Sequence, residues 1–220
     1  MSLLHTHGWR ILLVVSGVLL AAGGPMHPGS DGSDTIRQEL TTMTADDAWV
    51  PGHTLVAVST AVLAAGLWAA YRSGAWPASV RRTLAITATI VSIYVVETVF
   101  HLAAVVDSDE LAHGHAAPVA MTHLGLAAVL YPVSGWAIVF LAWAFGRAWT
   151  GWRRGIAVLG IVAGLAHAFS VPLTFLLPEA ELTPVFALAG MTLALFSIAT
   201  GAVGAPRAAV VPAKVPVLVD

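Results

Sequence analysis

The sequence predicts an all-α integral membrane protein, a bundle of six transmembrane helices with both termini in the cytoplasm and a short amphipathic helix outside. Only 10% of the 220 residues are charged, and a mean hydropathy of +0.83 excludes an ordinary soluble domain. Six apolar runs are each about 20 residues long, which is enough to cross a bilayer. The basic residues also concentrate in alternate loops, as they do in membrane proteins.

The six apolar runs define the expected spans. A removable signal peptide is the alternative interpretation of the first run, which follows His-Gly-Trp-Arg and ends in Ala-Ala-Gly-Gly. The basic region before it is thin, which favours a retained helix. We expect one membrane domain over residues 1–206 and a flexible cytoplasmic tail over 207–220, because proline interrupts that segment and it is too short to span. The expected spans are residues 9–25, 53–71, 83–105, 119–146, 155–177 and 184–204.

The basic residues predict the orientation of these spans. Nine of the ten lysine and arginine residues fall on one side, and Arg37 is the exception. By the positive-inside rule this side is the cytoplasm, and it also holds both chain ends. The sequence therefore predicts a multi-pass protein of the cell (inner) membrane. The basic residues on that side are Arg10, Arg72, Arg81, Arg82, Arg147, Arg153, Arg154, Arg207 and Lys214.

The longest soluble stretch is the outer loop of residues 26–52, which begins with a turn sequence rich in glycine, proline and serine. Apolar residues recur at helical spacing over 36–43 and predict a short amphipathic helix, capped by Ser33 or Asp34. We interpret this helix as a lid over the outer face or as a linker that rests on lipid. Trp49 follows at the expected level of the membrane–water interface.

The second outer loop, DSDELAHGHAAP, carries His113 and His115 among three acidic residues. Such a loop can collect a cation and pass it inward. A solvated polar loop explains the same composition equally well.

The most informative feature is an acidic residue inside the apolar run VSIYVVETVFHLAAVV of the third span. Glu97 and His101 are four residues apart and therefore lie on one helix face. An ionisable side chain at the centre of a membrane costs about 2.5–3.5 kcal/mol on insertion scales, so such residues pair with one another and mark functional sites. An unpartnered carboxylate at this depth has to bind a proton or a cation.

Three further histidines are expected near the same level. His53 begins the second span from outside, His123 lies about one turn into the fourth span, and His167 lies nearer the mid-plane in the fifth. Contact with lipid headgroups also explains histidines near span ends. No ionisable residue is expected in the inner half of any span, and this one-sidedness predicts a shared polar centre. Its expected members are His53, Glu97, His101, His123 and His167.

These residue types are those of a metal site. The chain has no cysteine, so a metal has to be held by imidazole, carboxylate, carbonyl or water. Neutral imidazoles and a carboxylate form a suitable shell for zinc, copper or iron. The five residues just named are the predicted ligands. Glu97 is also the candidate catalytic residue, either as a ligand or as a general base for a metal-bound water.

The leading hypothesis is a metal-dependent membrane enzyme, a hydrolase or an oxidoreductase, that acts on a lipophilic small molecule. One alternative is a b-type haem protein with paired axial histidines, although haem propionates seek basic partners and Arg37 is the one expected outer cation. Another is a proton or cation transporter, which needs a polar path through the inner half of the spans. Membrane lipids are expected partners, and a net charge of −2 without a basic patch excludes nucleic acid.

Overall fold

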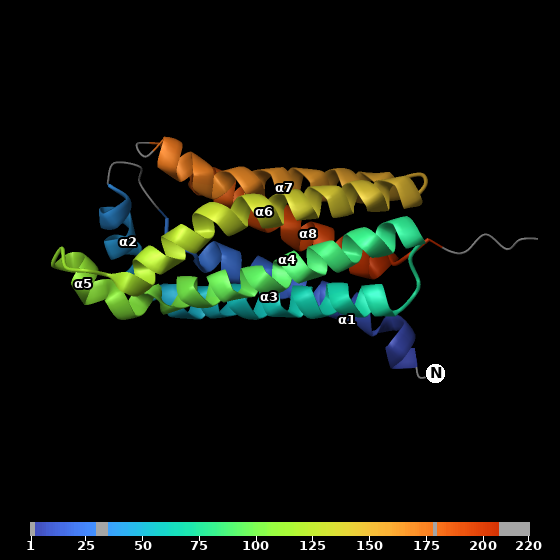
Figure 1. Cartoon of the computed structure of the whole chain (residues 1–220), viewed down its shortest axis with the longest axis horizontal. Coiled ribbons are helices and arrows are strands. Elements are labelled where there is room, and N and C mark those ends of the chain that lie inside the picture. Colours follow the sequence, from blue (N-terminus) through green and yellow to red (C-terminus); the bar gives the residue numbers. More distant parts are fainter. Residues whose placement is uncertain (1–2, 30–34, 178–179, 207–220) are drawn as a thin grey trace, which may run out of the picture.

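The computed structural model describes residues 3–29, 35–177 and 180–206, and the regular elements among them are all helical. Six helices are long and apolar enough to cross a membrane, which confirms the prediction of an all-helical multi-pass membrane protein. The long helices are α1 (Leu3–Gly23), α3 (Trp49–Arg72), α4 (Ala78–Ala103), α6 (Pro118–Ala148), α7 (Arg153–Leu176) and α8 (Thr183–Val203). The short elements are α2 (Ile36–Thr44), α5 (Ser108–Ala112) and the 3-10 turns η1 (Gly24–Met26) and η2 (Ala104–Asp107) (Figure 1).

The six long helices form a closed ring in chain order. Each packs on the next, from α1 on α3 to α7 on α8, and α8 closes the ring by packing on α1. The α3–α4 and α6–α7 hairpins turn at the same end of the bundle, the right-hand end in Figure 1. The arginines of both turns are therefore gathered at one end, which we call the basic end. Its assignment to the cytoplasm stays a prediction.

The helices extend beyond the spans predicted from hydropathy. α3 begins at Trp49 and α4 at Ala78, whereas the apolar runs begin at 53 and 83. A hydropathy pattern detects only the segment suited to hydrocarbon, and a helix continues into the polar interface until its backbone is interrupted. Pro77 marks the start of α4, with an extended backbone at ψ 153°.

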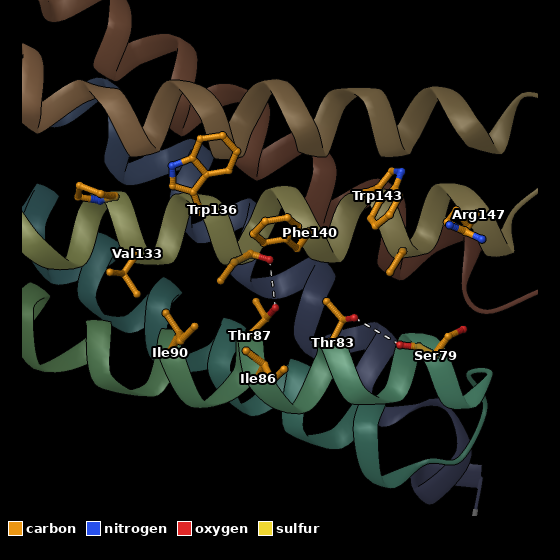
Figure 2. A pocket seen from close by; sticks show the side chains of 13 residues that line it. Ser79, Thr83, Ile86, Thr87, Ile90, Val133, Trp136, Phe140, Trp143 and Arg147 are labelled. Carbon is orange, nitrogen blue, oxygen red and sulfur yellow. Dashed lines mark hydrogen bonds between the residues drawn. The ribbon is translucent and has the colours of Figure 1, made fainter.

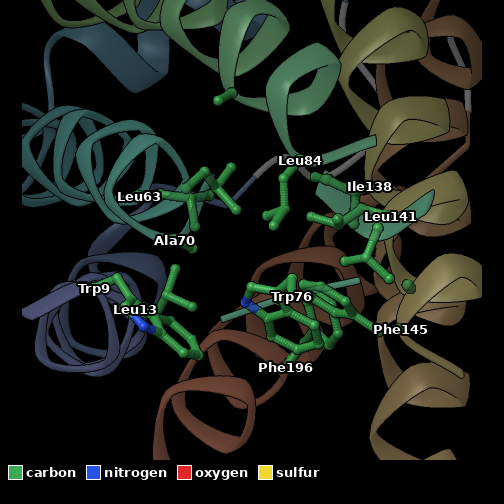
Figure 3. Close-up of a cluster of buried hydrophobic side chains, with 14 of the residues drawn as sticks. Trp9, Leu13, Leu63, Ala70, Trp76, Leu84, Ile138, Leu141, Phe145 and Phe196 are labelled. Atoms are coloured by element: carbon green, nitrogen blue, oxygen red, sulfur yellow. The ribbon is translucent and has the colours of Figure 1, made fainter. Parts of the chain in front are cut away.

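A cluster of aromatic and aliphatic side chains fills the bundle toward the basic end (Figure 3). Trp76, from the α3–α4 turn, is stacked on Phe145 with ring centroids 4.3 Å apart. It also contacts Trp9 and Trp149, each at 5.8 Å. The helices α1 and α6 and the turns that carry Trp76 and Trp149 are thereby joined by apolar contact, and the buried Glu97 lies toward the opposite end of the bundle.

The helices α6 and α7 approach closely where each carries a glycine. A Cβ added to Gly135 would lie 2.5 Å from the Ala168 nitrogen, and one added to Gly164 would lie 2.6 Å from the Gly135 carbonyl oxygen. Small residues hold membrane helices together because lipid removes most of the hydrophobic drive between them. This contact also brings together Ser134, which precedes Gly135, and His167, which precedes Ala168. Ser134 Oγ and His167 Nε2 lie 3.0 Å apart.

The amphipathic helix predicted in the first long loop is present as α2. Its N-cap is Thr35, whose hydroxyl accepts from the Gln38 backbone at 3.4 Å while the Gln38 side chain accepts from the Thr35 backbone at 2.9 Å. This capping box stands in place of the predicted cap at Ser33 or Asp34, which lie outside the described residues. Apolar spacing locates a helix, whereas the reciprocal hydrogen bonds of the cap decide its first residue.

Gly135→Leu is expected to destabilise the bundle, because the larger side chain meets the backbone of α7. Overpacking costs about 1–3 kcal/mol, and an unyielding backbone contact places this substitution at the upper end. The measurement is the temperature at which half of the detergent-solubilised protein is lost from the monodisperse peak. Gly190→Leu in α8 is the matched control, since an added Cβ there meets nothing within 4 Å. Equal midpoints for the two variants would contradict the close packing.

Candidate metal centre

Three helices and one turn bring five ionisable side chains together at the end of the bundle opposite the basic end. His27 follows the turn η1, and His53 lies near the start of α3. Glu97 and His101 lie near the end of α4, and His123 lies near the start of α6. This is the end that carries α2 and α5 in Figure 1. The structure therefore brings together four of the five residues that the sequence singled out, and it adds His27.

Three imidazoles form the first ligand group. One nitrogen from each of His27, His53 and His101 lies within 4.8 Å of the others. The ring centroids are 4.8 Å apart for His27 and His53 and 4.4 Å apart for His53 and His101. Nitrogens on one tetrahedral zinc ion are about 3.4 Å from one another, given bonds of about 2.0–2.1 Å. Binding of one ion by all three rings would require their nitrogens to lie about this far apart.

Two of these histidines are held in the tautomer that a metal requires. The Nδ1 of His53 lies 2.7 Å from the Trp49 carbonyl oxygen, and the Nδ1 of His27 lies 2.8 Å from that of Pro28. A carbonyl oxygen only accepts, so each Nδ1 carries the hydrogen and each Nε2 keeps its lone pair. The Nε2 of His53 is buried with no hydrogen-bond partner in the described part of the chain. Metal-binding histidines typically have one ring nitrogen free to coordinate while the other donates a hydrogen bond to a carbonyl oxygen.

Glu97 forms a second ligand group with His101 and His123. Its Oε1 makes a hydrogen bond of 2.8 Å with His123 Nδ1 and lies 3.7 Å from His101 Nδ1. The side chain is 0% exposed, and its Oε2 has no hydrogen-bond partner among the described residues. The rings of His101 and His123 stack at 4.0 Å. Because His101 belongs to both groups, the five side chains form one continuous cluster, which we call the metal centre.

His27 is the member that sequence reasoning missed. It stands in a Met-His-Pro-Gly turn, where no periodic pattern indicates which way a side chain points. The available signal was its position just after the outer end of the first span, level with the start of the second. His27 is the most exposed member of the centre, yet its ring packs against its neighbours. Removal of water from the ring lowers the pKa of His27, although the hydrogen bond to Pro28 acts in the opposite direction.

Trp49 forms one wall of the metal centre. Its ring lies 3.9 Å from that of His53 and 5.3 Å from that of His101, and its Nε1 donates to the Leu102 carbonyl oxygen at 3.2 Å. Its position at the start of a span predicted contact with the membrane–water interface, but the residue is completely buried. The burial comes from a tertiary contact, an apolar cluster that also contains Leu40, Ala104, Leu111, Ala117 and Ala120.

The helices α2 and α5 pack against each other over this wall. Leu40 of α2 and Leu111 of α5 are both buried in the apolar cluster. The hydroxyls of Thr44 and Ser108 lie 3.3 Å apart, which adds a polar contact between the two helices. Arg37 reaches beyond α5 and donates to the His115 carbonyl oxygen at 3.1 Å. These contacts favour the interpretation of α2 as a lid, because it packs on protein.

The two histidines of the second outer loop lie apart from the metal centre. Both are exposed, and neither belongs to a ligand group among the described residues. His115 pairs with Glu110 at 2.9 Å, and His113 Nδ1 bonds the Asp109 carbonyl oxygen at 2.8 Å. Local contacts of this kind favour a solvated polar loop over a collecting site for cations.

His167 also lies apart from the metal centre, in a second polar group. Its ring stacks on Tyr131 at 4.5 Å and meets Tyr94 edge-on at 5.2 Å. Ser134 Oγ donates to the Leu130 carbonyl oxygen at 2.6 Å and lies 3.0 Å from His167 Nε2. Among the described residues, His167 belongs to neither ligand group.

No family model, curated protein sequence or solved structure matches this chain. The function is therefore argued from the side chains of the metal centre and their surroundings. These comprise four imidazoles, one buried carboxylate, an aromatic wall and a covering helix.

Leu40→Ala is expected to loosen the contact of α2 with α5. Removal of a buried leucine side chain costs about 2–5 kcal/mol, which exceeds what the few polar contacts of α2 can offset. Amide hydrogen exchange should accelerate over 36–44 and over 108–112, while the α6 and α7 amides keep their protection. Thr42→Ala, on the exposed side of α2, is the control and should leave exchange unchanged. Unaltered exchange in L40A would mean that α2 is not held by this cluster.

Proposed function

We propose that the protein is a metal-dependent membrane enzyme, in which His27, His53 and His101 hold one metal ion and Glu97 is the general base. The observation that carries this proposal is the buried Nε2 of His53. It has no partner among the described residues, and His53 belongs to a group of three histidines that each offer a ring nitrogen within 4.8 Å of the others. A neutral ring nitrogen left unpaired in an apolar setting is unfavourable unless a cation or another donor uses its lone pair.

Zinc is the ion that the first ligand group suits best. Three imidazoles with one open position form a shell of the kind found in catalytic zinc sites. Copper also favours imidazole, and iron is better served by two histidines and a carboxylate, as in the second group. The buried carboxylate of Glu97 offsets part of the charge of one divalent ion. A second ion would add positive charge with no further carboxylate in either ligand group, so we expect one ion per chain.

Glu97 is oriented to act on a water molecule bound at the open position. A zinc ion in such a shell lowers the pKa of bound water to about 7. His123 holds one carboxylate oxygen at 2.8 Å, and the other oxygen has no partner among the described residues. A carboxylate oriented at one oxygen by His123, with Tyr94 as a further hydrogen-bonding neighbour, presents a defined lone pair to an incoming proton. In this arrangement a metal-bound water would give its proton to Glu97 Oε2, and His123 would orient Glu97 instead of binding the metal.

The surroundings of the metal centre favour an amphiphilic substrate. His27 is exposed at the end of the bundle, whereas the ring of Trp49 forms an apolar wall beside it at 6.3 Å. Phe186 of α8 stacks on His27 at 6.5 Å. The aromatic rings would contact the apolar body of such a substrate, and the open ligand position would take its polar group. We therefore expect an amphiphile with a hydrolysable group at the level of the lipid headgroups.

The packing of the imidazoles favours a bare ion over haem. Axial histidines approach haem iron from opposite faces of the porphyrin plane. The rings of His101 and His123 are stacked at 4.0 Å, which leaves no space for a porphyrin between them. Transport is less well supported than catalysis, because the bundle beyond the second polar group is filled by the aromatic and aliphatic cluster around Trp76.

Purified protein is expected to bind about one zinc ion per chain, as a closed histidine shell requires. His53→Ala and His101→Ala should each abolish stoichiometric binding, because each removes a ligand from a group of three. The measurements are elemental analysis after dialysis and a zinc affinity from competition with a chromophoric chelator. An absorption spectrum of the same sample should contain no Soret band.

The Glu97→Gln variant tests whether Glu97 acts as a general base or as a metal ligand. An outer partner of a metal site contributes about 10–100-fold to metal affinity, so the Gln variant should still bind zinc stoichiometrically at saturation. His113→Ala in the second outer loop is the control and should keep the wild-type affinity. Folded wild-type protein that fails to bind zinc, copper or iron would overturn the proposed function. Loss of stoichiometric zinc in E97Q would make Glu97 a ligand.

A further inference from the structure

A groove of about 780 Å³ runs between α4 and α6 on the surface of the bundle, nearer to its basic end. Its volume lies within the range of ligand sites in proteins. Figure 2 shows side chains of both helices pointing into the space between them. Thr87 closes its floor, where its hydroxyl donates to the Ala137 carbonyl oxygen at 3.2 Å. The groove contains none of the residues of the metal centre, so its occupant is a separate question from the enzymatic site.

One wall of the groove is a row of aromatic side chains on α6. Trp136, Phe140 and Trp143 recur at four and three residues and therefore share one helix face. They are 43%, 54% and 54% exposed. Tryptophan in membrane proteins concentrates at the two interfaces. Trp136 is instead about 18 Å along the helix from its end at Ala148, at 1.5 Å per residue, and faces the hydrocarbon.

The groove ends in groups that attract an anion. The guanidinium of Arg147 lies 5.3 Å above the ring of Trp143, and Ser79 lines the opposite side. No described arginine forms a salt bridge with a carboxylate. The described acidic residues all lie toward the other end of the bundle, whereas the basic end also holds Arg72, Arg81, Arg82, Arg153 and Arg154. The positive potential at Arg147 is therefore not offset by a neighbouring acid of the described chain.

The length of the groove matches one lipid molecule. Pro132 and Arg147 are 15 residues apart on α6, which is about 22 Å at 1.5 Å per residue. Half of a bilayer, headgroup included, is about 20–22 Å thick. A phosphate at Arg147 therefore places the end of an acyl chain near Pro132 and Ile90, at the far end of the groove.

We propose that this groove binds one anionic phospholipid from the leaflet at the basic end, with its phosphate at Arg147 and Ser79 and an acyl chain along the aromatic row. By the positive-inside rule this is the cytoplasmic leaflet. The lipid supplies the negative charge that the basic end lacks and covers three aromatic side chains along one face.

The test uses the full chain in detergent, incubated with palmitoyl-oleoyl phosphatidylglycerol or with phosphatidylcholine of the same chains, and counts retained lipids by native mass spectrometry. One phosphatidylglycerol should be retained per chain, and phosphatidylcholine should be retained several-fold less. Arg147→Gln should weaken phosphatidylglycerol retention about fivefold, which is the usual effect of one basic side chain at a membrane surface. Arg153→Gln, at the same end but outside the groove, is the matched control.

A second variant tests the acyl-chain contact without changing the charge. Ile86→Trp fills the groove beside Phe140 and should reduce phosphatidylglycerol retention while the protein stays monodisperse. Equal retention of the two lipids, or retention unchanged in R147Q and I86W, would overturn the proposal. Because the chain has no cysteine, a single Phe140→Cys reports directly on the other possible occupant. A disulfide dimer of F140C that forms in lipid, together with a monomeric I86W, would show that a second copy covers the groove.

Discussion

The carboxylate of Glu97 is completely enclosed, and much of the architecture at one end of the bundle follows from that fact. A charged group inside a membrane protein has to be paired, because lipid offers no hydrogen bonds in exchange for those of water. His123 of α6 meets this requirement at 2.8 Å, so the pair joins two neighbouring helices of the ring. Asp107 fixes the start of α6 in turn, since its Oδ2 accepts from the Val119 and Ala120 backbones at 2.7 and 3.0 Å.

This requirement also explains why the two ends of the bundle differ. Polar and ionisable side chains are tolerated where the helices enclose them and where the lid and turn segments bring partners from outside the spans. At the basic end the interior is filled by the stacked rings of Trp76 and Phe145, which need no such partners for their faces. The described charges at that end are arginines, of which Arg10 is partly buried and donates to the Gly201 carbonyl oxygen at 2.8 Å. The bundle thus combines a polar, ionisable end and an apolar, packed end along one axis.

The two proposed sites use opposite electrostatics. The metal centre gathers neutral imidazoles around one carboxylate, a set that favours a cation. The groove between α4 and α6 runs along a row of aromatic rings and ends at Arg147, a set that favours an anion with an apolar tail. In each proposed site, the charge of the expected ligand follows from a group that is absent nearby. The groove has no acid nearby among the described residues, and the metal centre has a histidine nitrogen without a partner.

Depth in the membrane was predictable from the sequence, and rotation about the helix axis was not. Counting residues from the span ends placed His53, Glu97, His101 and His123 at one level, because a helix rises by a constant amount per residue. The same count placed His167 only slightly deeper. Its separation from the metal centre follows from the close contact of Gly135 with α7, which turns its ring toward Ser134. Helix–helix packing of this kind depends on residues distant in sequence, and a hydropathy pattern contains no information about it.

The sequence by itself determined that the chain is a six-helix membrane protein. It also determined that the third span contains an ionisable pair that is costly to place in a membrane, because both properties depend on local composition and spacing. Tertiary structure decided which residues complete the site. His27 enters it through the turn η1, outside any helical period, and Trp49, four residues before His53 on α3, is buried through the contact of α2 with α5. Loop residues are placed by the elements that they touch. The identity of the metal centre therefore emerges only when four separate segments of the chain are brought together.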